Sequence, residues 1–262
     1  MPEGDTISRA AFTLSRAIAG RIVRGFRSSL GEPRGGPVAG RRIESVAAAG
    51  KNLLVRFDDG RTLRTHMRMH GSWHLYRPGE RWRKPAAFAR AVLETDEWTA
   101  VCFSAPIVEW LRPGEERTHP ALARLGPDVL GEVFREDEAV SRLRACPDVE
   151  IGAALLDQRR IAGIGNIWKS ETLFRCRADP FARVSALSDA ALAGVVREAR
   201  KLMGRNAGAA PAPGKPTLAG TYAVYRRSGR PCRRCGTAIA MRRQGEERRS
   251  TYFCPACQGV AP

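Results

Sequence analysis

The feature that most constrains how this 262-residue chain can fold is a set of four cysteines near its carboxyl end. They form two pairs, Cys232-x-x-Cys235 and Cys254-x-x-Cys257, separated by 18 residues. Two such pairs at this separation are typical of a Zn²⁺ ion held tetrahedrally by four thiolates. Since a four-cysteine site leaves no coordination position open, the spacing predicts a structural zinc ion. The alternatives are chance clustering and a redox pair.

The segment between the cysteine pairs is rich in arginine around Gly245: Arg242, Arg243, Arg248 and Arg249. This pattern predicts a β-hairpin with an arginine-rich tip. Such a hairpin can enter a DNA groove and contact phosphates, whereas the alternative is a solubilising surface loop. Three further cysteines have no partner at metal-ligand spacing and are expected to be small buried hydrophobic residues: Cys102, Cys146 and Cys176.

The charge balance favours a polyanionic partner for the whole chain. Forty-four Lys and Arg face 27 Asp and Glu, which gives a net charge of +17. Arginine forks match phosphate oxygens, so nucleic acid is the leading candidate, ahead of a membrane surface or a merely solvated charge. No apolar run approaches the roughly 20 residues that span a bilayer, and the acidic, polar start differs from a secretory signal. A cytosolic location with reduced cysteines is therefore expected.

The first half of the chain predicts a helix followed by an antiparallel sheet. Apolar residues at three-four spacing predict a helix over residues 6–19, capped by Asp5 or Thr6 and ended by Gly20. A Gly/Pro-rich loop follows at 31–40. Short strand patterns then alternate with turns, including Asp58-Asp59-Gly60, and no long helix separates them: 53–57, 61–66, 73–76, 88–95 and 98–103. This order favours a β-sandwich over a parallel sheet.

The second half reads as helical. Helices are expected in five places, followed by a loop or linker at 207–214: 118–125, 135–145, 150–158, 166–176 and 188–204. The fold class is therefore α+β. The predicted domains are a β-sandwich over 1–125, a helical domain over 126–216 and a zinc hairpin over 217–262.

A glycine-rich turn precedes the helix expected at 166. Gly163 and Gly165 allow the backbone to approach a ligand closely, and Asn166 is a good N-cap. Because helix amino termini bind phosphate, the turn is a candidate phosphate site. An ordinary helix-turn-helix with packing glycines is an equal alternative.

The amino terminus, Met1-Pro2-Glu3-Gly4, offers a nucleophile if the methionine is trimmed. Removal of Met1 exposes a secondary amine at Pro2, and an α-amino group has a pKa of about 7.7–8.0, so part of it is neutral near pH 7. Attack of this amine on a sugar C1′ gives an iminium, which is an electron sink, and Glu3 is placed to transfer protons. Taken alone, the same residues are an unremarkable start to a helix.

These motifs together resemble the Fpg/Nei family of DNA glycosylases, and the endonuclease VIII branch most closely. The resemblance covers nearly the whole length and rests on the four-cysteine finger and seven segments: Pro2-Glu3-Gly4, Gly50-Lys51-Asn52-Leu53-Leu54, Leu111-Arg112-Pro113, Thr118-His119-Pro120, Leu125–Leu130, Leu156-Asp157-Gln158 and Gly163–Asn166. It implies a sandwich domain, a helix-two-turn-helix domain and a zinc finger. It also implies a bifunctional glycosylase and AP lyase that excises oxidised bases, of the pyrimidine class by branch, from double-stranded DNA as a monomer.

The resemblance implies a role for each matching residue. Pro2 is similar to the Schiff-base nucleophile and Glu3 to the proton donor. Lys51 resembles the lysine that contacts phosphate and assists β-elimination, and Arg249 resembles the finger arginine tied to δ-elimination. Two further residues match DNA contacts, a phosphate ligand and an arginine near the end of the first domain: Asn166 and Arg124. No redox cofactor or catalytic metal is required.

The loop that fills the gap left by a flipped base corresponds to Arg68-Met69-His70. It departs from the Gln-Leu-Tyr of a typical endonuclease VIII, although Met69 is apolar and flexible enough to act as a wedge. The stretch Ala105–Glu109 stands where the 8-oxoguanine branch usually carries Asp-Pro-Arg-Arg-Phe, which argues against that branch. Asp5 stands where some relatives have proline.

Three other functions are compatible with parts of the pattern. The chain could be a lyase acting mainly on abasic sites, a non-catalytic zinc-finger DNA-binding protein or a zinc-ribbon RNA-binding protein. The last two explain the charge and the cysteines but leave Pro2, Glu3 and Lys51 without a purpose.

Overall fold

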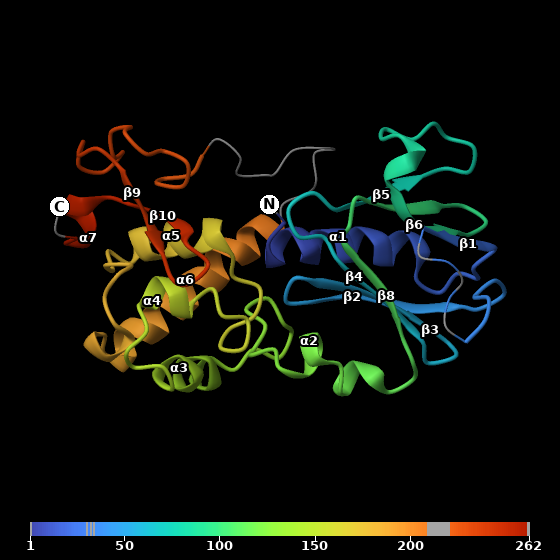
Figure 1. Ribbon diagram of the computed structural model, residues 1–262, viewed down its shortest axis with the longest axis horizontal. Helices are drawn as coiled ribbons and strands as arrows, with labels where there is room; N and C mark the ends of the chain where they lie inside the picture. Colours follow the sequence, from blue (N-terminus) through green and yellow to red (C-terminus); the bar gives the residue numbers. More distant parts are fainter. Residues whose placement is uncertain (1, 30, 32, 34, 209–220, 261–262) are drawn as a thin grey trace. The chain divides into compact units, whose positions relative to one another are not determined.

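The computed structural model describes residues 2–29, 31, 33, 35–208 and 221–260. The chain divides into two compact units, Met1–Ala123 and Arg124–Pro262 (Figure 1). The division falls close to the first expected boundary, at residue 125. The helical segment and the cysteine-rich segment share one unit, whereas the sequence-based division counts them as two domains.

The first unit contains two four-stranded antiparallel sheets, which confirms the expected sandwich. One sheet has the order β1-β6-β7-β5, with β1 (Gly25–Ser28), β6 (Ala89–Glu94), β7 (Thr99–Phe103) and β5 (Ser72–Tyr76). The other has the order β2-β3-β4-β8, with β2 (Ile43–Ala49), β3 (Asn52–Phe57), β4 (Thr62–His66) and β8 (Ile107–Leu111).

The core of this unit follows from the period-two pattern of its strands. Leu53, Val55 and Phe57 of β3 are fully buried and pack with the inward residues of β6 and β7. The predicted turn at Asp58-Asp59-Gly60 closes the β3–β4 hairpin, and Gly60 has the positive φ of 78° that the turn needs.

Helix α1 (Gly4–Ile18) begins two residues earlier than expected, and Glu3 rather than Asp5 or Thr6 is its N-cap residue. Its buried face carries the predicted three-four pattern: Ile7, Ala11, Leu14, Ala17 and Ile18. This face joins the sandwich core, and the helix runs alongside β2 (Figure 1). A left-handed Gly20, with φ 79°, ends the helix and turns the chain toward β2.

The direction of α1 decides where the amino terminus lies within this unit. Just past the helix, Gly20 N donates to Ile43 O, the first residue of β2, at 2.7 Å. The 15-residue helix is about 22 Å long and the seven-residue strand about 23 Å. Since α1 runs back along a strand of equal length, its amino end lies at the β2–β3 turn that carries Lys51.

Three strands were not named from the sequence, and two expected helices are shorter. Strand β2 is alanine-rich and β1 has only four residues, so neither shows a strong strand pattern in the sequence. Strand β8 begins directly after Pro106, and proline usually marks the end of a strand pattern. The helix expected at 118–125 is a 3₁₀ turn, Glu115–Arg117, followed by α2 (Pro120–Ala123). The sequence did not predict the 3₁₀ turn over Ala86–Phe88.

The second unit contains α3 (Glu136–Arg144), α4 (Ile151–Ala154), α5 (Asn166–Arg175) and α6 (Asp189–Gly208), with a 3₁₀ turn at Val184–Ala186. Their buried faces form one core that includes Leu143, Trp168, Leu173 and Val196. Helix α6 includes Ala207 and Gly208, which the sequence assigned to a linker. The rest of that stretch, 209–214, lies outside the described residues.

The helix expected at 150–158 ends at Ala154, because the Gln158 side chain satisfies the backbone of the following loop. Its amide donates to Leu156 O and Ile164 O at 2.9 and 3.0 Å, and its oxygen accepts from Gly163 N at 3.0 Å. After α6 the described chain resumes at residue 221 and forms the antiparallel hairpin β9 (Ala240–Gln244) and β10 (Arg249–Phe253), then α7 (Pro255–Gln258). None of the described helices is long and apolar enough to cross a membrane.

Gly71 gives a direct test of the tight turn between β4 and β5. A Cβ at this position would lie 2.7 Å from Met67 Cα, and Gly71 N donates to Met67 O at 2.8 Å. Gly71→Ala should therefore lower the free energy of unfolding by roughly 2 kcal/mol, measured by urea denaturation. The matched control is Gly204→Ala in α6, where nothing lies within 4 Å, and it should stabilise by up to about 1 kcal/mol. Equal effects of the two substitutions would contradict this account of the turn.

Candidate active site and nucleic-acid interface

The amino end of α1 holds a proline next to a buried carboxylate. Pro2 is half-buried, and the Glu3 residue is only 1% exposed. Glu3 O accepts hydrogen bonds from Thr6 N and Ile7 N, both at 3.0 Å, so the backbone here is fixed by the helix. The helix amino end also favours the negative charges of Glu3 and the buried Asp5.

Lys51 lies in the β2–β3 turn, where Gly50 takes a positive φ of 58°. The next residue, Asn52, pairs across the sheet with His66, the last residue of β4. We call Lys51, Arg64, His66 and Arg68 the basic end of the sheet. Because α1 runs antiparallel to β2, Pro2 and Glu3 lie at the same end of the first unit as Lys51.

His66 is neutral within this basic end. Burial is the largest cause that lowers the pKa of His66, to about 4, and the charges of Arg64, Lys51 and Arg68 add to it. Its Nδ1 accepts from Arg68 N at 3.2 Å, so in the neutral ring Nε2 carries the hydrogen. The basic end therefore offers a neutral N–H donor together with the cations Lys51 and Arg68, which suits an anion such as phosphate, whereas Arg64 is buried against Glu109.

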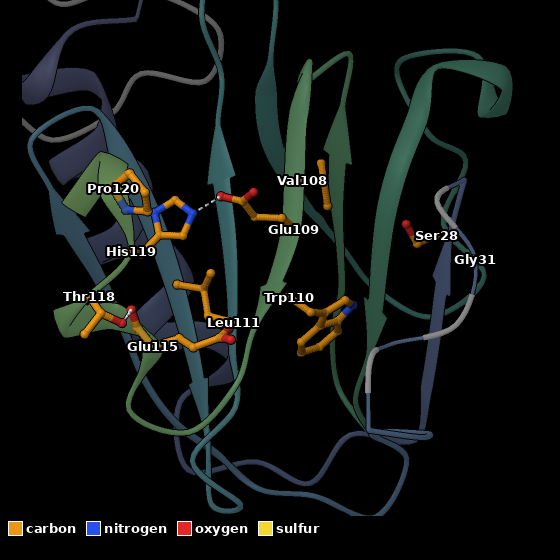
Figure 2. A pocket seen from close by; sticks show the side chains of 10 residues that line it. All are labelled: Ser28, Gly31, Val108, Glu109, Trp110, Leu111, Glu115, Thr118, His119 and Pro120. Carbon is orange, nitrogen blue, oxygen red and sulfur yellow. Dashed lines mark hydrogen bonds and ion pairs between the residues drawn. The ribbon is translucent and has the colours of Figure 1, made fainter. Parts of the chain in front are cut away.

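A polar network that the sequence did not predict holds Arg64 in place. Its Nε donates to Asn52 Oδ1 at 3.0 Å, and its other side bonds to Glu109 on β8. His119 Nε2 lies 3.2 Å from the same Glu109 carboxylate, as Figure 2 shows. The Thr118-His119-Pro120 motif was visible in the sequence, but no pattern in the sequence pairs it with Glu109.

A cavity of about 500 Å³ runs along β8 beside this network. Its lining includes Trp110, Leu111, Glu115 and His119, and Figure 2 shows them around the strand. None of the predicted catalytic or DNA-contacting residues lines it. The cavity therefore borders the support of Arg64 and is separate from the candidate catalytic residues.

The turn Arg68-Met69-His70 is fully on the surface between β4 and β5. Met69 is 51% exposed, which is unusual for a large apolar side chain, and its two neighbours are exposed as well. Arg68 adopts a left-handed φ of 41°, a rare conformation for a residue with a Cβ. The turn thus presents an apolar side chain between two polar ones, the arrangement expected of a wedge.

In the second unit, Asn166 is the first residue of α5, and Gly165 is the N-cap, which corrects the predicted cap. The reason is that the Asn166 side chain is used elsewhere: its Nδ2 donates to Ser250 O at 2.7 Å. Asn166 is 4% exposed, and its Oδ1 is buried with no hydrogen-bond partner among the described residues. Asn166 therefore joins the glycine turn to the strand that carries Arg249.

A buried polar chain fastens the hairpin to α5. Lys169 is fully buried, and its Nζ donates to Thr251 Oγ1 at 2.6 Å. Thr251 Oγ1 donates to Gln244 Oε1 at 2.7 Å, and Gln244 Nε2 donates to the Glu150 carboxylate at 2.9 Å. Because buried polar groups are costly when unpaired, this series of hydrogen bonds fixes the position of the hairpin on the helices.

Strands β9 and β10 form the predicted hairpin. Its tip is less uniformly basic than expected. Arg242 stacks over Phe181 and Phe253 at 5.3 and 5.6 Å, so part of its role is packing. Glu247 lies 3.9 Å from Arg249, whose side chain is 37% exposed. Arg248 and Arg243 are exposed, and Arg124 is exposed at the start of the second unit.

The four paired cysteines meet at one point. All four sulfurs lie within 4.8 Å of one another, with Cys235 and Cys254 3.4 Å apart and Cys232 and Cys257 4.0 Å apart. A tetrahedral ion with metal–sulfur bonds of about 2.3 Å separates its sulfurs by about 3.8 Å. The four residues therefore fit one tetrahedral metal ion. Of the other three cysteines, Cys102 and Cys146 are buried as expected, whereas Cys176 is only half-buried.

Comparison with known proteins finds two family profiles along the chain. The formamidopyrimidine-DNA glycosylase N-terminal domain matches residues 1–106, and the formamidopyrimidine-DNA glycosylase H2TH domain matches residues 125–209. A probable endonuclease 8 2 of Streptomyces coelicolor is 42% identical over all of this chain and 96% of its own length. The DNA-(apurinic or apyrimidinic site) lyase Nei2 of Mycolicibacterium smegmatis is 36% identical, covering 98% of this chain and 99% of the relative.

Solved structures show the same fold. The MutM (Fpg) protein of Thermus thermophilus superposes with a TM-score of 0.83 at 30% identity, over the full length of both chains. A Lactococcus lactis formamidopyrimidine-DNA glycosylase, bound non-covalently to DNA containing an AP site, gives 0.83 at 21% identity over 98% of this chain and 99% of that one. The second likeness is evidence of fold alone.

The neutral His66 can be tested by titration. We expect an NMR midpoint near pH 4 for its ring, because burial and three nearby cations oppose its protonation. Since the folded pKa lies below the usual value of about 6.5, the unfolded chain takes up the proton first, and His66 lowers stability as pH falls from about 6.5 to 4. His66→Asn should lose less stability than the parent between pH 7 and 5. A midpoint near 6.5 would contradict the described environment.

Proposed function

Because the chain belongs to the family of formamidopyrimidine-DNA glycosylases and endonucleases VIII, we propose that it is a bifunctional DNA glycosylase and AP lyase of base excision repair. It excises a damaged base and then cuts the strand. The observation that carries the proposal is the place of Pro2, at the amino end of a helix whose direction brings it to the basic end of the sheet. The names of the relatives, endonuclease 8 2 and Nei2 lyase, support strand cleavage, and the glycosylase profile over residues 1–106 supports base excision.

The proposed reaction begins at the Pro2 nitrogen, once Met1 has been removed. Its lone pair forms a bond to C1′ of the damaged nucleotide, and the base leaves with the glycosidic electron pair and a proton. The C1′–O4′ bond then breaks and O4′ takes up a proton, so the sugar ring opens and the secondary amine becomes an iminium, which acidifies C2′. Loss of a C2′ proton expels the 3′ phosphate by β-elimination, and a second elimination expels the 5′ phosphate. Water then hydrolyses the linkage between the sugar remnant and Pro2 and frees the enzyme.

Glu3 is the proposed proton-transfer group of these steps. It is the residue next to the nucleophile, and its backbone is fixed as the N-cap of α1, so its position is set before substrate arrives. Low exposure keeps competing water away from the carboxylate. The pKa of an α-amine, about 7.7–8.0, leaves part of Pro2 neutral near pH 7, so no large shift is needed for attack.

The other site residues bind and distort DNA in this proposal. Lys51 and its neutral neighbour His66 contact the phosphates beside the flipped nucleotide, and Lys51 assists β-elimination. Met69 fills the gap in the base stack, flanked by Arg68 and His70. In the second unit Arg124 binds phosphate, and Asn166 does so with the Nδ2 hydrogen that Ser250 does not take. Arg249 binds DNA and assists δ-elimination.

Oxidised pyrimidines are the proposed lesions. The support is the endonuclease VIII resemblance and the absence of Asp-Pro-Arg-Arg-Phe from residues 105–109. A lyase with little base excision is the second candidate, favoured by the name of the Mycolicibacterium relative. The enzyme is proposed to work as a monomer on damaged double-stranded DNA in the cytosol.

The metal of the four-cysteine site is proposed to be one structural Zn²⁺ ion. Four thiolates at tetrahedral spacing suit zinc and leave no position for water or substrate. The ion would fix the base of the β9–β10 hairpin and so the approach of Arg249. It takes no part in the bond changes.

Borohydride trapping tests the proposed nucleophile. Reduction should freeze a covalent adduct between the enzyme and an abasic-site duplex, and Pro2→Gly, which leaves a primary amine, should cut trapping at least tenfold. Glu3→Gln should impair base excision more than trapping on a pre-formed abasic site, where no base has to leave. Full trapping by the Pro2 variant would overturn the assignment, and binding without any cleavage would favour the non-catalytic alternative.

Metal analysis tests the zinc proposal. We expect one zinc per chain by mass spectrometry of the purified protein, because four deprotonated thiols hold the ion. Cys235→Ser should lose most of the metal and weaken DNA binding. The matched control is Cys176→Ser, which removes a thiol outside the cluster and should retain the full zinc content. Zinc retained by the Cys235 variant would refute the assigned ligands.

A further inference from the structure

The loop between β5 and β6, residues 77–88, is strongly basic, and we call it the basic arm. It carries four cations and a single carboxylate: Arg77, Arg81, Arg83, Lys84 and Glu80. The Glu80 carboxylate accepts from Arg77 N at 2.9 Å, so it closes the turn at the start of the arm. None of the site residues assigned above lies in this loop.

The arm is anchored on the outer face of the β1-β6-β7-β5 sheet. Trp82 stacks on Tyr76 at 6.2 Å and meets the edge of Phe103 at 5.7 Å. Arg83 N donates to Tyr76 Oη at 3.1 Å, and Lys84 Nζ donates to Ser72 Oγ at 2.9 Å. Trp82, Tyr76 and Phe103 belong to a second apolar cluster, apart from the sandwich core, so the middle of the arm is held on this face.

The anchors also show where the arm leads. Strand β5 begins at Ser72, directly after the turn that carries Met69, and ends at Tyr76. From Tyr76 the arm returns along the strand, since Lys84 reaches back to Ser72. Lys84 therefore lies at the start of β5, two residues after the exposed turn Arg68-Met69-His70.

The outer cations of the arm have no carboxylate to neutralise them. Arg77, at its base, lies 3.7 Å from Glu97 and stacks on Trp98 at 3.9 Å. For Arg81, Arg83 and Lys84, the described part of the chain provides no ion pair, and both arginines are exposed. His74, beneath the arm, has its pKa lowered by burial and by Lys84 and Arg83, so it adds no charge.

We propose that Arg81 and Arg83 bind the phosphate backbone of duplex DNA outside the nucleotide that reacts. The inference rests on the proposed function and extends it, because it adds a contact surface beyond the turn that replaces the flipped base. Arginine forks without carboxylate partners match phosphate oxygens. Both arginines are exposed and neither lines the cavity beside β8, which favours an extended backbone over a small enclosed anion.

The test compares DNA binding by Arg81→Ala/Arg83→Ala with that by a control of equal charge change, Arg16→Ala/Arg24→Ala. Both control residues are exposed and lie at or after the carboxyl end of α1, away from Lys51. Fluorescence anisotropy would be measured with a duplex of about 30 base pairs that contains a reduced, uncleavable abasic site, at several salt concentrations. The arm variant should bind about tenfold more weakly, and its salt slope should fall by about 2 units, one for each lost phosphate contact.

A charge-preserving variant, Arg81→Lys/Arg83→Lys, should restore most of the salt slope. The single-turnover cleavage rate at saturating enzyme should stay unchanged in all variants, since the arm holds DNA outside the reacting nucleotide. Parent-like affinity and slope in the alanine variant, or an equal change in the control, would overturn the proposal. If borohydride traps no adduct with the parent protein, the enzymatic function fails, while the binding comparison still decides the role of the arm.

Discussion

The alignment of α1 with β2 is the constraint on which the rest of the account depends. The hydrogen bond from Gly20 to Ile43 fixes the carboxyl end of the helix at the start of the strand, and the equal lengths carry the amino end to the β2–β3 turn. The apolar face of α1 is part of the sandwich core, so the helix cannot slide without opening that core. The proposed nucleophile, Pro2, lies near a chain terminus, which is usually a mobile position, and the packing of the 15-residue helix holds it there.

The basic end of the sheet combines cations with a neutral histidine, which suits the phosphate contacts proposed for it. Glu109 and Asn52 hold Arg64 from the side, while His66 stays neutral among the cations. A protonated His66 would add repulsion to a cluster that already carries three positive charges. The same principle recurs beneath the basic arm, where His74 lies close to Lys84 and Arg83.

In the second unit, polar contacts hold the small β9–β10 hairpin against the helices. Lys169, Thr251 and Gln244 are buried and hydrogen-bonded in series, and Asn166 adds a bond to Ser250. The Glu171 carboxylate accepts hydrogen bonds from the three backbone N–H groups of residues 223–225, at 2.8–2.9 Å. This segment lies shortly before Cys232, the first cysteine of the four-cysteine site. The cysteine cluster and these polar contacts together hold the strand on which Arg249 lies.

The sequence predicts most of the regular structure because the patterns are local. The three-four spacing of α1, the Asp-Asp-Gly turn and the cysteine pairs each fall within one short segment. Strand β2 was not predicted because Ala47, Ala48 and Ala49 have little preference for strands, and their pairing with β3 decides their conformation. The helix expected to reach residue 158 stops at Ala154 because of a long-range role for the Gln158 side chain.

The site was less predictable where residues act across the fold. Lys51, Asn166 and Arg249 could be proposed from motifs, whereas the links from Arg64 to Glu109 and from Lys169 to Thr251 join positions 45 and 82 residues apart. The basic arm is visible as composition, but only the contacts of Trp82 and Lys84 place it along β5.

Peptide mapping of the borohydride-reduced adduct tests the central claim most directly. After nuclease and protease digestion, tandem mass spectrometry locates the nitrogen that carries the sugar remnant. The account predicts that the modified peptide begins with Pro2 and bears the remnant on its terminal nitrogen. A remnant on Lys51, the lysine of the adjoining turn, or a modified peptide that still begins with Met1, would contradict it.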